Sequence, residues 1–216
     1  MDLSESIEDY VLTVYRLEKL CGVARTAQIA RELKIREGTV SKVMKKLQSG
    51  GLVVLSSYRG VRLTDNGRRI AEKILRKHAV LETFLSNYLG FDLIKAHYLA
   101  HRMEHLPDEV IEAIYVKLGR PSLRYLMSLV GEVKDLDKVL TLNKTTPGRC
   151  YEITHLYVEL STVLDKLVRS GCGYPCVVRV EGLGSKGISV STRKTSSVFT
   201  HQEGEAIYVQ EVDCSE

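Results

Sequence analysis

The stretch from residue 26 to residue 64 constrains the fold of this chain more than any other part of its sequence. Thr26 is placed to cap a short helix over 27–33, and a break at 34–38 leads into a second helical segment over 39–47. The apolar runs at 52–55 and 61–64 enclose a Ser- and Gly-containing turn, which predicts a β-hairpin. Two short helices with a tight turn and a following hairpin are typical of a winged helix-turn-helix.

The second of these helices separates its residues into two faces. Val40, Val43, Met44 and Leu47 form an inner apolar stripe, and small polar and basic residues are left to face outward. In a winged helix this outward face enters the major groove of DNA. The residues that we expect to contact the groove are Arg36, Thr39, Ser41 and Lys42. Those that we expect to contact phosphates, including two at the tip of the hairpin, are Lys45, Lys46, Tyr58 and Arg59.

The charge of the chain is concentrated in the same region. Residues 22–77 contain 14 Lys and Arg against 4 Asp and Glu, a net charge of +10. Because the whole chain carries +4, the remainder must carry −6. A basic block within an otherwise acidic protein indicates a surface that binds a phosphate backbone, although a solvated basic face has the same composition.

Other features of the sequence narrow the class of protein. No apolar run is long enough to span a membrane, and the acidic start at residues 1–5 is unlike a signal peptide, so we expect a cytoplasmic protein. The five cysteines are scattered and odd in number, which argues against a disulfide framework. Cys172 and Cys176 could bridge or bind a metal, but a simple turn is the favoured interpretation. No phosphate-binding loop or nucleophile elbow is present.

Four of the six histidines fall on two neighbouring segments. On the first segment, His78 and Glu82 are four residues apart and share a helix face. The second segment carries a group of four residues that would share a face on one continuous helix. The members of that group are His97, His101, Glu104 and His105. Imidazoles and carboxylates converging from two adjacent helices predict a site for a divalent metal, whereas each pair alone could be a solvated helix face.

The remainder of the chain alternates in the manner of β-strands and predicts a small β-barrel with one helix over 160–170. We therefore predict an α+β protein of several domains. Their expected bounds are 1–73 for the winged helix, 74–125 for a helical metal and dimerisation domain, 126–144 for a linker and 145–216 for the β-domain.

Several motifs resemble the DtxR/MntR family of metal-dependent repressors along most of the length from Glu8 to Pro121. The motifs that carry the resemblance are Glu8-Asp9-Tyr10, Thr39-Val40-Ser41, Gly51-Leu52-Val53, Leu63-Thr64-Asp65-Asn66-Gly67, Arg76-Lys77-His78 and Glu104-His105. The resemblance implies a winged helix, a helical dimerisation and metal domain, and a C-terminal SH3-like (FeoA-like) domain.

The resemblance also implies two sets of metal ligands. The residues that correspond to an ancillary site are His78, Glu82 and His97, and those that correspond to a primary site are Asp9, His101, Glu104 and His105. The sequence departs from the family at His101, where relatives carry cysteine or a carboxylate, and at Leu12, where some carry glutamate. Glu159 is a further candidate ligand from the C-terminal domain.

These features together predict a metal-dependent repressor, a homodimer that binds double-stranded operator DNA with Mn²⁺ or Fe²⁺ as corepressor. One alternative is a winged-helix regulator that responds to a non-metal ligand. Another is a di-iron enzyme, which we disfavour because such sites use Glu-x-x-His and this chain has the reversed order at His101 and Glu104. We therefore do not expect an enzyme.

Overall fold

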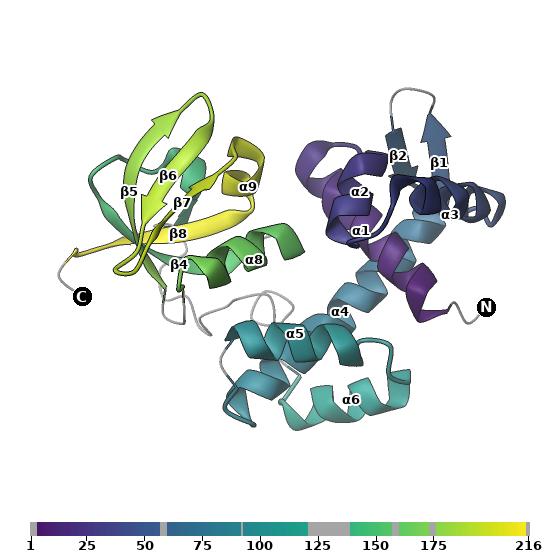
Figure 1. Cartoon of the computed structure of the whole chain (residues 1–216). Helices are drawn as coiled ribbons and strands as arrows, with labels where there is room; N and C mark the ends of the chain where they lie inside the picture. The colour runs from purple at the N-terminus through teal and green to yellow at the C-terminus, as the bar shows by residue number, and fades with distance from the viewer. Residues whose placement is uncertain are drawn as a thin grey trace.

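The computed structural model describes residues 4–56, 60–91, 93–120, 139–156, 160–172 and 176–214. The winged-helix region comprises α1 (Glu5–Cys21), α2 (Thr26–Glu32), α3 (Glu37–Ser49), β1 (Val53–Ser56) and β2 (Gly60–Leu63). The following helices are α4 (Asp65–Asn87), α5 (Leu93–Met103) and α6 (Asp108–Lys117). Figure 1 shows α4 running from the winged helix to α5 and α6.

The predicted winged helix-turn-helix is confirmed. Val40, Met44 and Leu47 of α3 are buried, and β1 pairs with β2 in antiparallel register, with Val53 opposite Leu63. The sequence predicts Thr26 as the N-cap of α2, and this is wrong. The preceding Arg25 holds the N-cap position, and the Arg25 backbone N–H donates to the Gln28 side chain. The hairpin tip with Tyr58 and Arg59 lies outside the described residues.

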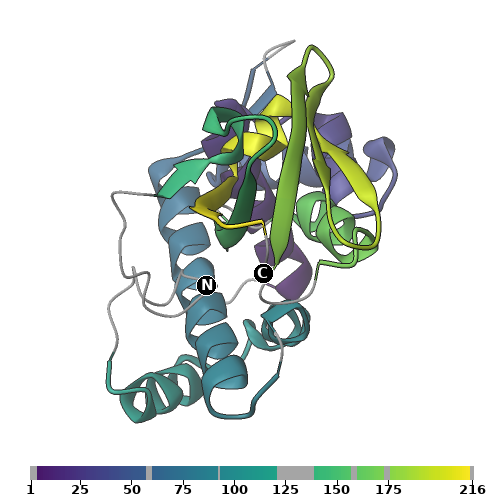
Figure 2. The same ribbon diagram turned by 90° about the vertical axis from the view of Figure 1, so that its left-hand side faces the viewer.

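Helix α4 connects the DNA-reading region to the second helical region. It begins after Thr64, whose hydroxyl oxygen accepts a hydrogen bond from the Gly67 N–H at 3.1 Å. It packs against α1 and also against α5 and α6, and the turned view in Figure 2 shows its length. A separate apolar core between α4, α5 and α6 contains Val80, Leu81 and Ile111.

The C-terminal region is a six-stranded antiparallel sheet with helices beside it, the SH3-like domain predicted from the sequence. Its strands are β3 (Val139–Thr141), β4 (Cys150–Leu156), β5 (Val177–Gly184), β6 (Gly187–Ser191), β7 (Ser196–Phe199) and β8 (Ile207–Val212). Their order across the sheet is β3-β8-β4-β5-β6-β7. Its helical elements are η2 (Leu142–Lys144), α8 (Ser161–Arg169) and α9 (His201–Glu205).

Strand β3 lies within the stretch 126–144 that the sequence predicts as a linker. It belongs to the sheet because it pairs with β8, with Leu140 opposite Val209. Three residues are too few to show an alternating pattern. The remaining part of the predicted linker, 126–138, lies outside the described residues.

The C-terminal domain packs on the winged helix. Apolar side chains of both regions, such as Ile29 of α2 and Leu164 of α8, belong to one buried cluster. Helix α8 lies between the sheet and the N-terminal helices (Figure 1), and it contacts α2. The contact surface of α8 is therefore part of the core that positions the helix-turn-helix.

The expectation that the cysteines form no disulfide framework is wrong for four of the five. Cys150 pairs with Cys214 and Cys172 with Cys176, with Cα atoms 5.2 and 5.1 Å apart. The first pairing joins residues 64 apart in sequence that β4 and β8 bring together. Linear spacing cannot show this proximity. Within the described ranges, no helix combines the length and the apolar character needed to cross a membrane.

Gly67 provides a direct test of how α4 joins the hairpin. A Cβ atom at this position collides with the carbonyl oxygen of Leu52, whereas a Cβ atom at Gly38 of α3 meets nothing within 4 Å. We predict that Gly67→Ala lowers the free energy of unfolding by about 1–3 kcal/mol because a backbone atom must move. Gly38→Ala should raise it by about 0.4–1 kcal/mol. Urea denaturation followed by circular dichroism measures both; equal effects would contradict the assigned contact.

Candidate metal centre

Three helices and one turn, from the helical region and the winged helix, supply the side chains of the candidate site. Helix α4 carries His78 and Glu82, one turn apart on its buried face. Helix α5 carries His97 and His101, and the turn after it carries Glu104 and His105. Helix α1 supplies Glu8 and Asp9 from the winged helix. The site therefore forms where the two regions meet.

The structure corrects one assumption about this site. Helix α5 ends at Met103, so Glu104 and His105 lie in a turn and do not continue the helix face of His97 and His101. Pro107 is consistent with this end, because proline has no N–H to bond the carbonyl four residues earlier, that of Met103, and its ring clashes with that carbonyl in a continuing helix. The sequence predicts that Glu104 continues the helix of His97 and His101. In the structure it lies in the turn instead, and its side chain is placed between α4 and α5.

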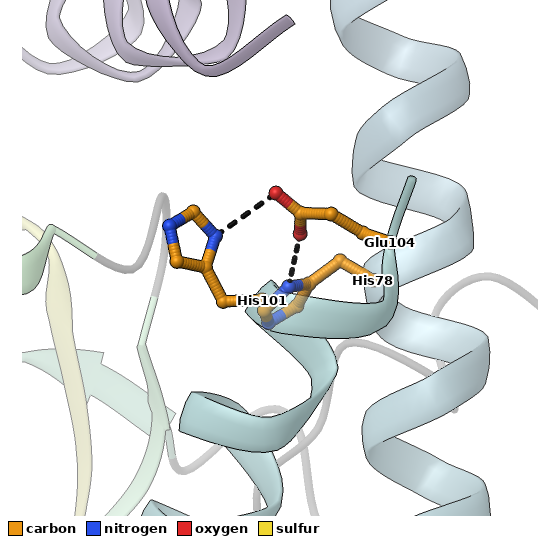
Figure 3. Close-up of side chains that lie close together, drawn as sticks. All are labelled: His78, His101 and Glu104. Carbon is orange, nitrogen blue, oxygen red and sulfur yellow. Dashed lines mark hydrogen bonds and ion pairs between the residues drawn. The ribbon is translucent and has the colours of Figure 1, made fainter. Parts of the chain in front are cut away.

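The Glu104 carboxylate lies at the centre of the site and is completely buried. One oxygen is 2.6 Å from His78 Nδ1 and the other is 2.9 Å from His101 Nδ1 (Figure 3). Burial opposes ionisation of this carboxyl, but the hydrogen bonds to His101 and His78 outweigh it and lower the pKa to about 2. The same bond raises the pKa of His101. Glu104 is thus a carboxylate at neutral pH.

A second group forms around the other nitrogen of His78. His78 Nε2 is 3.0 Å from His97 Nδ1 and 3.6 Å from Glu82 Oε2, and the two imidazole rings meet edge to face. Glu82 Oε1 is 3.8 Å from His97 Nδ1. All three residues are buried, so their donor atoms are enclosed by α4 and α5.

The third group joins the winged helix to the turn after α5. His105 Nδ1 is 2.7 Å from Glu8 Oε2, and His105 Nε2 is 3.4 Å from Asp9 Oδ1. Burial raises the pKa of Asp9. No described residue lies within hydrogen-bonding distance and geometry of the buried Asp9 Oδ1. A buried carboxylate oxygen without a hydrogen-bond donor, facing an imidazole, fits a site for a cation.

Together these contacts place the possible ligand atoms in three groups, and within each group the atoms all lie within 4.8 Å of one another. The groups are His78, Glu82 and His97; His78, His101 and Glu104; and Asp9, Glu104 and His105. The first reproduces the set that the resemblance assigns to an ancillary site. The third holds three residues of the predicted primary set, and the second joins His101 and Glu104 of that set to His78 of the ancillary set. Because they share His78 and Glu104, the seven side chains form one continuous network of nitrogen and oxygen donors.

Two charged residues on α1 were missed from the sequence. Glu8 contacts His105, and Arg16 is buried close enough to Glu104 to lower its pKa further. Arg16 is seven residues after Asp9, two helical turns along the same face, so periodicity could have indicated it. Leu12 on this helix is buried and offers no ligand atom. Glu159 lies outside the described residues.

The residues expected to contact DNA are placed on the surface of the winged helix. Arg36 is the residue before α3. Along α3 the polar and basic side chains are exposed, while Val40, Met44 and Leu47 are buried. The exposed positions are Arg36, Thr39, Ser41, Lys42, Lys45 and Lys46. This surface is on α3, whereas the histidine network is on α4, on α5 and the turn after it, and at Asp9 of α1 (Figure 1).

Comparison with known proteins agrees with this architecture. Residues 2–61 match the family model for the iron-dependent repressor N-terminal DNA-binding domain, and residues 64–124 match that for the iron-dependent repressor metal-binding and dimerisation domain. The fold is thus that of a winged-helix regulator with a second helical domain. The chain belongs to the iron-dependent repressor family.

Individual relatives extend the comparison. The diphtheria toxin repressor of Corynebacterium diphtheriae is 35% identical over 117 residues, which cover 54% of this chain and 52% of that protein. The chain spans about half the length of the diphtheria toxin repressors that it matches. The regulator MntR of Listeria welshimeri is 35% identical over 100 residues, 46% of this chain and 70% of MntR. The solved manganese regulator SloR has the same fold, with a TM-score of 0.68 at 22% identity over 95% of this chain and 98% of SloR.

The lowered pKa of Glu104 predicts how stability depends on pH. The ionised carboxylate stabilises the fold above the ordinary pKa of 4.5, and this contribution is lost as the pH falls toward about 2. In metal-free protein, the difference in free energy of unfolding between wild type and Glu104→Gln should therefore shrink steadily between pH 5 and about pH 2. Urea denaturation at several pH values measures it. A difference that stays constant would show that the carboxylate is not held by the histidines.

Proposed function

We propose that this chain is a metal-dependent transcriptional repressor that binds double-stranded operator DNA, with Mn²⁺ or Fe²⁺ as corepressor. The observation that carries the proposal is the junction of Glu104 and His105 with Asp9 of α1. Ligand atoms of these three residues lie within 4.8 Å of one another although they come from the two family domains. A cation at this point ties the DNA-reading domain to the metal domain.

The donor set supports a hard or borderline divalent metal. The proposed ligands are Asp9, His78, Glu82, His97, His101, Glu104 and His105. They offer carboxylate oxygen and imidazole nitrogen but no sulfur, which suits Mn²⁺ and Fe²⁺. A bound cation would satisfy the buried Asp9 Oδ1, which accepts no hydrogen bond from the described residues. The ancillary group around His97 is a second place for a metal.

The path from this site to DNA runs through α1. Tyr10, Val11 and Val14 of α1 are buried in the core of the winged helix, so fixing Asp9 fixes the position of the domain that carries α3. A metal that binds the fixed arrangement more tightly than the loose one raises DNA affinity by thermodynamic linkage. The exposed basic positions of α3 then supply the salt-dependent contacts to phosphates.

We infer a homodimer whose interface is on the helical domain. Tyr88, Leu89 and Val116 are large apolar side chains that remain exposed near the end of α4 and on α6. Two winged helices in a symmetric dimer can enter successive major grooves. We propose the functional division 1–73, 74–125 and 145–216, with α4 crossing the first boundary and the connecting segment 126–144 adding β3 to the C-terminal sheet. We propose that the chain is a cytoplasmic regulator without catalytic activity.

Fluorescence anisotropy with a duplex from upstream of the protein's own gene tests the proposal. We predict that Mn²⁺, or Fe²⁺ under anaerobic conditions, lowers the Kd for DNA at least tenfold relative to chelator-treated protein, which corresponds to about 1.4 kcal/mol of coupling. His105→Ala should lose this response and retain the circular dichroism spectrum of the fold. Lys45→Gln serves as control, since it should weaken DNA binding with and without metal.

Equal DNA affinity with and without metal would favour a winged-helix regulator that responds to another ligand. Full metal response in His105→Ala would refute the junction with α1. A scrambled duplex of the same length separates specific binding from attraction to phosphates.

Glu8 should orient His105 for metal binding. A carboxylate that accepts a hydrogen bond from Nδ1 leaves Nε2 of the same ring free to face Asp9. We predict that Glu8→Ala weakens Mn²⁺ binding by about 10- to 100-fold, as measured by isothermal titration calorimetry. Glu5→Ala, an exposed position in the first turn of the same helix, is the control and should bind as wild type does. Identical affinity for Glu8→Ala would remove it from the site.

A further inference from the structure

One face of α8 makes polar contacts with both of the other domains. The Thr162 hydroxyl donates to Glu32 Oε1 at 2.6 Å, and Glu32 ends α2. Three residues further, on the same face, Asp165 Oδ2 is 3.1 Å from Lys34 Nζ. The other oxygen of Asp165 accepts a hydrogen bond from Tyr98 Oη of α5 at 2.9 Å. A single carboxylate of the C-terminal domain thus joins the helix-turn-helix to the histidine helix.

The two partners of Asp165 lie next to the functional parts of their own domains: one is in the turn before α3, and the other is beside a histidine of the candidate metal centre. Lys34 lies in the turn between α2 and α3 and has a φ of 55°, in the left-handed region that residues other than glycine rarely adopt. Such backbone strain is retained where the surrounding structure requires it. Tyr98 is adjacent to His97, and their rings lie 5.9 Å apart. Movement of α5 at the metal centre is therefore movement of Tyr98.

We propose that Asp165 makes the C-terminal domain a second mechanical link between the metal centre and the helix-turn-helix, parallel to the link through α1. The link itself is independent of the function proposed above, whereas its regulatory consequence rests on that function. When α5 is fixed at His97, Tyr98 holds Asp165, and Asp165 holds the turn before α3 through Lys34.

The role of this contact is positional and only weakly stabilising. The Lys34 side chain is 70% exposed, and ion pairs with such exposure add little to stability. Burial opposes ionisation of Asp165, yet the bonds to Tyr98 and Lys34 lower its pKa, so it remains a charged acceptor for both. The partly buried Glu32 to Thr162 bond and the shared apolar core hold α8 on α2. Asp165 adds the connection to α5.

Hydrogen exchange of the full chain, without DNA, tests the link directly. In metal-free protein, Asp165→Asn should speed amide exchange about two- to fivefold in 31–36, because the neutral amide loses the ion pair with Lys34, and in 95–101, because a neutral acceptor binds the Tyr98 hydroxyl more weakly than a carboxylate does. Tyr98→Phe should affect 95–101 more than 31–36. Glu211→Gln removes a comparably exposed ion pair with Arg149 inside the C-terminal domain and should change neither segment. Unchanged exchange in Asp165→Asn overturns the link.

The regulatory part is tested by the ratio of DNA Kd values without and with Mn²⁺. Asp165→Asn should reduce this ratio about threefold or more, and Glu211→Gln should leave it unchanged. If Asp165→Asn speeds amide exchange but leaves the ratio of DNA Kd values unchanged, the proposed coupling between metal binding and DNA binding through Asp165 is overturned. If wild type shows no metal-dependent ratio, the proposed function fails, and hydrogen exchange still decides whether the link exists.

Discussion

The buried carboxylate of Glu104 is the contact on which the arrangement of helices depends. It has no exposed surface, and it is held by imidazoles from α4 and α5 while its neighbour His105 reaches α1. Leaving such a group without partners is far more costly than any gain from burial, so the three elements must approach together. The same contact requires the turn after Met103, because an uninterrupted helix would direct the side chain elsewhere.

Much of the fold was predictable because its signals are local. The two helices of the helix-turn-helix and the hairpin that follows them each have a pattern within a few residues, and the structure confirms them. The seven metal-site residues were predicted from spacing and from the family resemblance, and the structure brings them into one network. Their assignment as ligands remains a proposal that the metal measurements test.

The features that were missed depend on contacts distant in sequence. Strand β3 is defined by its pairing with β8, and the Cys150–Cys214 bond by the approach of two strands, so neither has a local pattern. Glu8 looked like an ordinary acidic residue in a first helical turn. Only the position of His105, 97 residues later, gives it a role. Sequence periodicity can identify a helix face but not what lies opposite it.

The length of α4 has a geometric consequence for how small a change at the centre needs to be. From Asp65 to His78 the helix rises about 20 Å, so a tilt of about 5° at the histidine displaces its first turn by nearly 2 Å. In a symmetric dimer the two displacements add, and the spacing between recognition helices must match one turn of DNA, about 34 Å. In such a dimer, a tilt of α4 by a few degrees near His78 therefore changes the spacing of the two recognition helices enough to alter their match to the grooves.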